Sequence, residues 1–380
     1  MSAPKGSLQA ESFNEYDSLA SNPFTTHLTS GAAPEDPSTQ YSDYGFIAML
    51  ALAQRLHIHF LPITWQAALG PLGEGGQAGI NQALIHVQTS FAFKCFKNAS
   101  QIHNFERTSF QELINEMVVL SHPLIKEHPH VVRLEGVCWD VSQDDQVWPV
   151  LVFEKAHLGD LDQFITSKGK KLSMEDRLNL CADIGIAIRD MHSNSKGYYT
   201  LEILLVGSSD IDIIHGDIKP KNVLVFEHEP NSYVARVADF GYSTRFCGEH
   251  DLILMPKSYP WNAPEHHDRG FLAPKAKKLD VYSFGAVCFW LLLEGNSSMP
   301  PHLQTSRNDG QFTSFKDVLK SRTNDGSLLG FSIKLIEECG DFSRELQERL
   351  CRFFDCTLTS DSDKRSADFD YLLHLLAPSR

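Results

Sequence analysis

The sequence lacks several features that would assign a chain to a class directly. No two of its eight cysteines are spaced C-x-x-C, which fits reduced core thiols in a cytoplasmic protein. Its most apolar run, Val281–Leu293, holds 13 residues, too few to cross a bilayer, and predicts a buried helix. No charged segment followed by an apolar one opens the chain, so no signal peptide is predicted.

An excess of basic residues is also missing. The chain has 34 basic and 48 acidic residues, a net charge of −14, so a nucleic-acid-binding face is not favoured. With 380 residues, 42% of them apolar and 22% charged, it can form two or three domains or one large two-lobed domain.

The first part of the chain changes character near residue 43. Residues 1–42 are rich in Ser, Pro, Asn, Thr and Ala, which predicts a disordered leader. Phe46, Ile47 and Leu50 then repeat at helical spacing behind Asp43, which can cap a helix. Residues 43–60 are therefore expected to form an N-terminal helix or extension that docks on the following domain.

The remaining chain divides into a strand-rich and a helix-rich part. About five strands, within 58–79 and over 81–87, 90–96, 131–139 and 147–153, surround one helix at 110–120. Helical patterns cover 161–167, 173–192, 279–293, 331–356 and 366–376, whereas 296–328 is polar and predicts a surface loop. The expected fold is α+β, with a mostly antiparallel N-lobe (61–154) and a helical C-lobe (157–378), together spanning 61–378.

The stretch from Ile213 to Phe226 is central to the interpretation. Two apolar runs, which predict short buried strands, flank Asp217, Lys219 and Asn222. Three such polar residues within six positions are rare beside a packed core unless each has a partner. The stretch is either a polar hairpin loop or a catalytic loop.

Two segments of the N-lobe have the residue types that bind phosphate groups. The glycine-rich segment 72–80 allows backbone N–H groups to approach a phosphate, although a plain hairpin turn fits equally well. Lys94 is the one charge in an apolar strand, and is either an edge-strand lysine or a buried phosphate ligand. Glu116 borders the apolar stripe of its helix, where it either meets Lys94 or reaches solvent.

The C-lobe adds a possible metal ligand. Asp239 stands at the end of a strand before Phe240-Gly241, a position suited to metal binding. Ala263-Pro264-Glu265 and a helix opening with Asp280 follow.

In their order and spacing these motifs resemble the signature set of eukaryotic protein kinases. The resemblance extends from about Ile63 to Leu376, over four-fifths of the chain. It covers the glycine-rich loop, the strand lysine, the helix glutamate, the catalytic loop and the Asp-Phe-Gly and Ala-Pro-Glu motifs. Asp280-Val281-Tyr282-Ser283-Phe284-Gly285 is similar to the family's D-x-W-S-x-G helix start.

The resemblance implies ATP and Mg²⁺ as cofactors and a role for each matched residue. Asp217 would accept or orient the proton of the substrate hydroxyl, Lys219 would neutralise the γ-phosphate, and Asn222 and Asp239 would hold the metal ions. Phe153 would be the gatekeeper, and residues 154–156 the hinge that contacts adenine. The implied ATP-binding set is Leu72, Gly73, Gly75, Ala78, Ile80, Ala92, Lys94, Glu116, Glu154, Ala156 and Leu224.

Two further contacts are implied within the C-lobe. Asp280 would brace the catalytic loop, and Arg365 would pair with Glu265. Asp-x-Lys-Pro-x-Asn resembles serine/threonine kinases, and Gly216 before Asp217 resembles the tyrosine-kinase-like branch of plants and fungi.

The sequence departs from the kinase pattern at four places. Gly216 replaces the arginine that normally grips a phosphate on the activation loop, where Ser243, Thr244 and Ser258 are the candidate sites. Ala78 replaces the third glycine, residues 193–211 form an insert with a possible strand at 198–206, and a long loop at 121–130 leaves Glu112 as an alternative to Glu116.

The expected function is transfer of the ATP γ-phosphate to Ser/Thr hydroxyls of protein substrates in the cytoplasm. One alternative is a pseudokinase that acts as an ATP-binding or scaffold module. Its support is the irregular glycine-rich loop, Gly216 and the insert at 193–211. The other is a small-molecule kinase of related fold, against which Ala263-Pro264-Glu265 and Asp280 argue.

Overall fold

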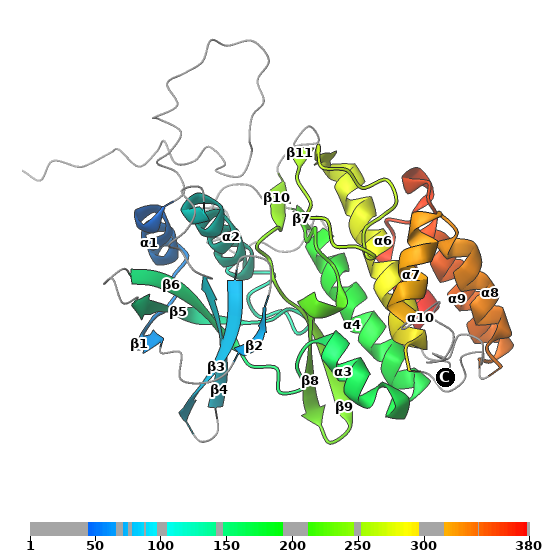
Figure 1. The fold of residues 1–380 in the computed structure, drawn as a ribbon, viewed down its shortest axis with the longest axis horizontal. Helices are drawn as coiled ribbons and strands as arrows, with labels where there is room; N and C mark the ends of the chain where they lie inside the picture. Colours follow the sequence, from blue (N-terminus) through cyan, green and yellow to red (C-terminus); the bar gives the residue numbers. More distant parts are fainter. Residues whose placement is uncertain are drawn as a thin grey trace, which may run out of the picture.

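The structure is a computed structural model that describes residues 45–65, 71–74, 78–86, 89–96, 105–141, 147–192, 212–246, 252–295, 315–340 and 342–377. The chain forms two lobes, a sheet with two helices at one end and a larger helical body at the other (Figure 1). This is the two-lobed α+β arrangement that the sequence predicts.

The N-lobe sheet has one more strand than predicted. Its order is β1-β5-β6-β4-β3-β2, and every pair is antiparallel except β1 and β5. The segment 58–79 contains two strands, and the first of them pairs with a strand far along the chain, which periodicity within one segment cannot show. The strands are β1 (Phe60–Trp65), β2 (Pro71–Glu74), β3 (Ala78–His86), β4 (Thr89–Phe96), β5 (Leu134–Val141) and β6 (Val147–Glu154).

The predicted N-terminal helix is present as α1 (Phe46–Arg55). It lies beside α2 (Phe105–Leu120) in Figure 1, and Met49 and Ala53 are completely buried there. The rings of Phe46 and Phe60 pack against Trp139 of β5, with centroids 5.8 and 5.6 Å away. Gly45, and not Asp43, is the N-cap residue; Asp43 itself lies outside the described residues.

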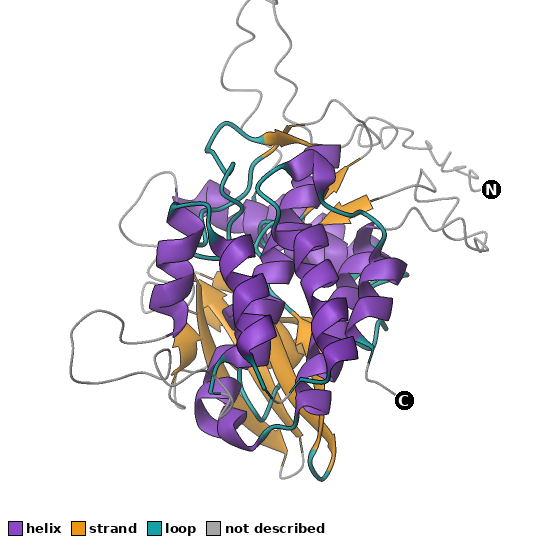
Figure 2. Cartoon of the chain, turned by 90° about the vertical axis from the view of Figure 1, so that its right-hand side faces the viewer, coloured by secondary structure: helices purple, strands orange, loops and turns teal. Residues whose placement is uncertain are grey.

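The C-lobe is built around α6 (Ala273–Leu293). Every side chain from Leu279 to Leu293 in this helix is buried, which confirms the predicted buried helix. Figure 2 shows the helices of this lobe packed in front of the strands. The helices around α6 are α3 (Leu161–Lys168), α4 (Met174–His192), α7 (Phe315–Asn324), α8 (Leu328–Glu338), α9 (Arg344–Leu358) and α10 (Phe369–Leu376). Within the described residues no helix is both long and apolar enough to cross a membrane.

Two predictions for this lobe need correction. The polar segment 296–328 was expected to be a loop, but its residues from 315 to 324 form α7, because Phe315, Val318 and Leu319 are buried at helical spacing. The pattern over 331–356 is divided between α8 and α9, which are separated near Cys339. The possible strand at 198–206 and the insert at 193–211 lie outside the described residues.

Within the described residues, three pairs of short strands lie outside the N-lobe sheet. β8 (Val223–Glu229) and β9 (Ser232–Val237) form a hairpin, and β7 (Asp212–Ile214) pairs with β10 (Thr244–Phe246). The 3-10 turn η5 (Pro220–Asn222) separates β7 from β8. β11 (Leu252–Ile253) and β12 (Phe271–Leu272) form a third small pair. The polar residues 215–222 are thus held between two strand pairs.

Candidate active site

The buried carboxylate of Asp280 holds the catalytic loop in place. Asp280, at 0% exposure in α6, accepts hydrogen bonds from the backbone N–H of His215 at 2.9 Å and of Gly216 at 3.0 Å. His192 lies 3.0 Å from the same carboxylate. The predicted bracing of the loop by Asp280 is present in the geometry.

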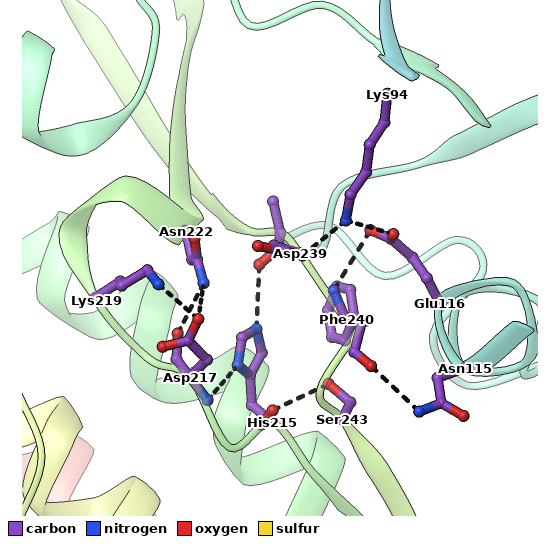
Figure 3. Close-up of polar contacts among 12 residues, drawn as sticks. Lys94, Asn115, Glu116, His215, Asp217, Lys219, Asn222, Asp239, Phe240 and Ser243 are labelled. Carbon is purple, nitrogen blue, oxygen red and sulfur yellow. Dashed lines mark hydrogen bonds and ion pairs between the residues drawn. The ribbon is translucent and has the colours of Figure 1, made fainter. Parts of the chain in front are cut away.

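Asp217 is buried and has several hydrogen-bond donors around it (Figure 3). Lys219 Nζ lies 2.6 Å from Oδ2, and Asn222 Nδ2 donates to the same oxygen at 3.0 Å and to the Asp217 carbonyl at 2.9 Å. Ser258 Oγ donates to the other oxygen, Oδ1, and itself accepts from Lys219 Nζ at 3.1 Å. The stretch from Ile213 to Phe226 is therefore no plain polar hairpin, since its three polar residues bind one another and Ser258.

Lys94 connects the two lobes through two carboxylates. Its Nζ lies 2.7 Å from Glu116 Oε2 and 2.7 Å from Asp239 Oδ1 (Figure 3). Burial acts to lower the pKa of Lys94, but Asp239 and Glu116 outweigh it and hold the pKa above its ordinary value. Burial likewise acts against ionisation of Asp239, but Lys94 outweighs it and lowers the pKa of this carboxyl. Both groups are therefore charged at neutral pH.

The helix glutamate is Glu116, and Glu112 is not its substitute. Glu112 lies one turn earlier on α2 and hydrogen-bonds the hydroxyl of Tyr242. The long loop at 121–130 therefore leaves the position of the glutamate unchanged.

Asp239 and Phe240 are held in a defined conformation. Asp239 has a φ of 65°, in the left-handed region that is unfavourable for residues with a side chain. Phe240 is completely buried, with its ring 5.0 Å from that of His215. His215 Nε2 in turn lies 3.1 Å from the Ala238 carbonyl. The packing of Phe240 thus fixes the direction of the neighbouring carboxylate.

The donor set suits Mg²⁺. The Asp239 carboxylate is 35% exposed although one oxygen binds Lys94, and Asn222 contributes an amide. Mg²⁺ is usually bound by one or two protein oxygen ligands together with substrate phosphates. No group of three or more His, Cys, Asp or Glu that could hold a metal occurs in the described part of the chain.

The predicted nucleotide-binding residues lie on the strands that face the junction. Leu72 and Gly73 are in β2 and Ala78 and Ile80 in β3, with Gly73 opposite Ile80; Gly75 lies outside the described residues. Ala92 in β4 is opposite Phe153 in β6, and Leu224, the second residue of β8, forms a bridge with Asp160. The predicted residues therefore come from strands of both lobes.

The predicted hinge follows β6. Glu154 is the last residue of this strand; its side chain accepts from Arg133 N–H at 2.9 Å and is ion-paired with Arg236. The Ala156 carbonyl accepts from Gly159 N–H at 3.3 Å. The side chain of Glu154 therefore connects the hinge to both lobes.

The candidate phosphorylation sites differ in their surroundings. Ser243 is 2% exposed and donates to the His215 carbonyl at 3.1 Å, and Ser258 binds Asp217 and Lys219. Thr244 lies in β10 opposite Ile214. The sequence indicates Ser258 only as a candidate phosphorylation site. Its contact with Asp217 could not be predicted, because the two residues are 41 positions apart and no local pattern connects them.

A second predicted ion pair lies away from this centre. Arg365 is almost completely buried and forms a two-pronged contact with Glu265, with Nη2 2.8 Å from Oε2. Its Nε donates to the Thr359 carbonyl at 2.9 Å. The Ala-Pro-Glu segment is thereby attached to the last third of the chain.

A strand-rich lobe and a helical lobe that meet at a lysine, two acids and an asparagine define a kinase-type fold. A family model described as "Protein kinase domain" matches residues 67–375. The chain belongs to the protein kinase family, and the resemblance seen in the sequence is confirmed.

Curated relatives come from a plant. Wall-associated receptor kinase 4 of Arabidopsis thaliana is 29% identical over 241 residues, which cover 62% of this chain and 28% of the relative. Wall-associated receptor kinase-like 6 (30% over 228 residues; 58% and 30%) and wall-associated receptor kinase-like 1 (28% over 254 residues; 66% and 30%), both of the same plant, are similar to it as well. The chain spans less than a third of the length of these relatives.

Proposed function

We propose that this chain is an ATP-dependent serine/threonine protein kinase that transfers the γ-phosphate of ATP to protein hydroxyls. The observation that carries the proposal is Lys94, which lies 2.7 Å from both Glu116 and Asp239. A mostly buried lysine held by two acids is pre-organised to meet phosphate oxygens, and the Asp239 carboxylate beside it is ionised.

The remaining roles follow from the contacts around Asp217. Asp217 orients the substrate hydroxyl and accepts its proton, while Lys219, 2.6 Å away, stabilises negative charge on the transferred group. Asn222 and Asp239 would hold Mg²⁺, which would supply positive charge to the phosphates. Phosphoryl transfer needs positioning and charge neutralisation more than covalent chemistry, and the contacts of Asp217, Lys219 and Asn222 support these roles.

Specificity for serine and threonine is supported by Lys219 and Ser258. Lys219 Nζ is 3.1 Å from Ser258 Oγ, and both bind Asp217. Asp217, with Lys219 and Ser258 bound to it, is the proposed acceptor site for a serine or threonine hydroxyl.

The alternative of a pseudokinase retains support from Gly216 and from Ala78 in the glycine-rich segment. Against it, no charged group of the proposed mechanism is lost, and Lys94, Glu116 and Asp239 are already paired as the reaction requires. The intact Glu265–Arg365 pair also favours a protein kinase over a small-molecule kinase of related fold.

We also propose ATP and Mg²⁺ as the cofactors, a protein substrate and a cytoplasmic location. The buried thiols of Cys138, Cys181 and Cys288, which form no disulfide, support a reducing compartment. Localisation of the full chain fused to a fluorescent protein tests this part.

We also propose that activation does not require a phosphate on the activation loop to be bound by the residue before Asp217. Gly216 has no side chain to bind a phosphate, and Ser243 is buried against His215. Alanine and aspartate variants of Thr244, which lies in β10, are therefore expected to keep wild-type activity. A strong change caused by ordering of the loop would contradict this part.

The test of the proposed function is labelling of a generic protein substrate with γ-labelled ATP and Mg²⁺, followed by phosphoamino-acid analysis. The expected products are phosphoserine and phosphothreonine, and Ser258→Ala should lose most of the labelling. Phosphotyrosine as the main product would contradict the assigned specificity.

A further inference from the structure

Helix α2 has a polar stripe formed by Glu112, Asn115 and Glu116. Their spacing of three and four residues places the three side chains on one face of the helix. This face is directed toward residues 239–242, which include the proposed metal ligand Asp239 (Figure 3).

The stripe binds consecutive residues of that segment. Glu116 Oε1 accepts from the backbone N–H of Phe240 at 3.4 Å, in addition to its ion pair with Lys94 through Oε2. Asn115 Nδ2 donates to the carbonyl of Gly241 at 3.2 Å. Both contacts are to the backbone, so they fix the path of the chain itself.

The third contact joins two side chains. The Tyr242 hydroxyl hydrogen-bonds the half-buried carboxylate of Glu112. Burial together with Glu112 raises the pKa of Tyr242 to about 12, so the Tyr242 hydroxyl keeps its proton at neutral pH and can donate it to Glu112. A Cβ on Gly241 would lie 3.3 Å from Glu112 Cβ, which shows how closely helix and segment approach.

We propose that Glu112 and Asn115 are positioning residues for the metal ligand Asp239, acting through Tyr242 and Gly241. The inference rests on the proposed function, in which Asp239 holds Mg²⁺. The polar stripe makes α2 and residues 239–242 one unit, so that the Lys94–Glu116 pair and the metal site form together.

The contacts of α2 stabilise the conformation of residues 239–242, a role that Gly216 in the catalytic loop cannot fill. Asp239 is in an unfavourable left-handed conformation, and Gly216 has no side chain to bind the segment that follows. The contacts of α2 offset that cost on the side of the N-lobe, independently of any phosphate group.

The experiment compares wild type with Tyr242→Phe, Asn115→Ala and a matched control, Gln111→Ala. Gln111 lies on the same helix, and no hydrogen bond from it to residues 239–242 occurs in the described structure. Phosphorylation is measured against free Mg²⁺ at saturating ATP. Binding of a non-hydrolysable ATP analogue is measured with and without Mg²⁺, and thermal unfolding is followed for each protein.

Loss of one hydrogen bond is expected to raise the half-maximal Mg²⁺ concentration about threefold to tenfold in Tyr242→Phe and in Asn115→Ala. The gain in analogue affinity caused by Mg²⁺ should fall by the same factor, while affinity without Mg²⁺ stays at the wild-type value. Gln111→Ala should match wild type throughout. Tyr242→Phe removes a single oxygen atom, so the folded protein remains testable.

Unchanged Mg²⁺ dependence in both variants would overturn the inference, and so would an equal loss of affinity with and without Mg²⁺. Failure of the proposed function gives a different result, in which wild type binds the analogue but transfers no phosphate. In that case, binding of the ATP analogue with and without Mg²⁺ still decides whether Glu112 and Asn115 position Asp239.

Discussion

Single side chains of this protein are placed by charge as much as by packing. Lys94 lies between Glu116 and Asp239, and its positive charge is what allows two carboxylates to remain close together in the site. Removal of Lys94 leaves two carboxylates close together without a cation, and Glu116 among them is buried. The same reasoning applies to a second buried acid, Asp183 in α4, which has no cation of comparable strength.

Asp183 is expected to make stability depend on pH. Burial raises the pKa of its carboxyl to about 7, although the Ala235 N–H donates to it at 2.9 Å. The folded state therefore binds more protons than the unfolded state between about pH 4 and pH 7, and this contribution to stability is lost as pH rises through that window. Asp183→Asn should be more stable than wild type by about 2–4 kcal/mol above pH 7, and equal to it near pH 4.

Urea unfolding of wild type and Asp183→Asn at several pH values measures this difference. His130, 3.4 Å from Asp183, is present in both proteins, so its own titration largely cancels in the difference between the two curves. A difference that does not vary with pH would contradict the assignment.

Gly216 provides a test of backbone conformation at one residue. Its φ is +81°, and an added Cβ would lie 3.4 Å from the Tyr242 carbonyl, so strain and not collision sets the cost. Gly216→Ala is expected to lower the free energy of unfolding by about 1–2 kcal/mol. The matched control is Gly330→Ala in α8, which meets no atom within 4 Å and should raise that free energy by about 0.5–1 kcal/mol. Chemical denaturation measures both, and equal effects would contradict the argument.

At the scale of elements, α1 and β1 extend the N-lobe beyond the antiparallel strands. α1 packs on α2, which carries Glu116, and β1 adds a parallel edge beside β5. The carbonyl of His59, the residue before β1, accepts from Val137 N–H at 2.9 Å and connects this extension to the sheet. We infer that α1 supports the position of α2 and, through it, the Lys94–Glu116 pair.

Met49→Ala is the variant that tests this support. Met49 is completely buried, so its truncation should lower the free energy of unfolding by about 2–4 kcal/mol and reduce phosphorylation. Ile47→Ala on the same helix is the control: Ile47 is 75% exposed, and its loss should change stability by less than about 0.5 kcal/mol. Equal effects of the two substitutions would show that α1 does not pack on α2 as described.

The elements differ in how well the sequence predicts them. Helix α4 (Met174–His192) is close to its predicted limits of 173–192, and Ser173 and Asp176 form a capping contact before it. Helix α2 ends at the predicted residue, Leu120, but it begins at Phe105, five residues before the predicted start at 110. β1 was not separated from its neighbour, because a parallel edge strand is defined by a distant partner. α7 was not predicted, because polar residues surround its three buried apolar side chains, Phe315, Val318 and Leu319.

Across the whole molecule, buried charges attach distant segments to one another. Arg365, near the C-terminal end, binds Glu265 across 100 residues, and Asp280 holds the catalytic loop from the centre of α6. Order and spacing of motifs made these two contacts predictable. The contacts of Ser258, Asn115 and Tyr242 were not, because they depend on how the lobes meet and no motif marks them.

Arg365→Met is expected to destabilise the whole fold. It removes the cation that pairs with Glu265 and a donor to the Thr359 carbonyl, which should lower the free energy of unfolding by about 3 kcal/mol. Arg344→Met is the control, because Arg344 is 93% exposed and its i,i+4 pair with Glu348 is worth at most about 0.5 kcal/mol. Thermal and denaturant unfolding distinguish the two, and a loss below about 1 kcal/mol for Arg365→Met would contradict a structural role for this pair.

The claim that the chain is an active kinase is tested most directly by phosphate transfer from ATP, with Mg²⁺ and a generic protein substrate. Wild type is compared with Asp217→Asn and Lys94→Met. Wild type should label the substrate, and each variant should lose at least about 100-fold in kcat, since the first removes the proton acceptor and the second the phosphate-binding cation. Equal residual labelling in all three proteins would contradict the account and leave a nucleotide-binding or scaffold module in its place.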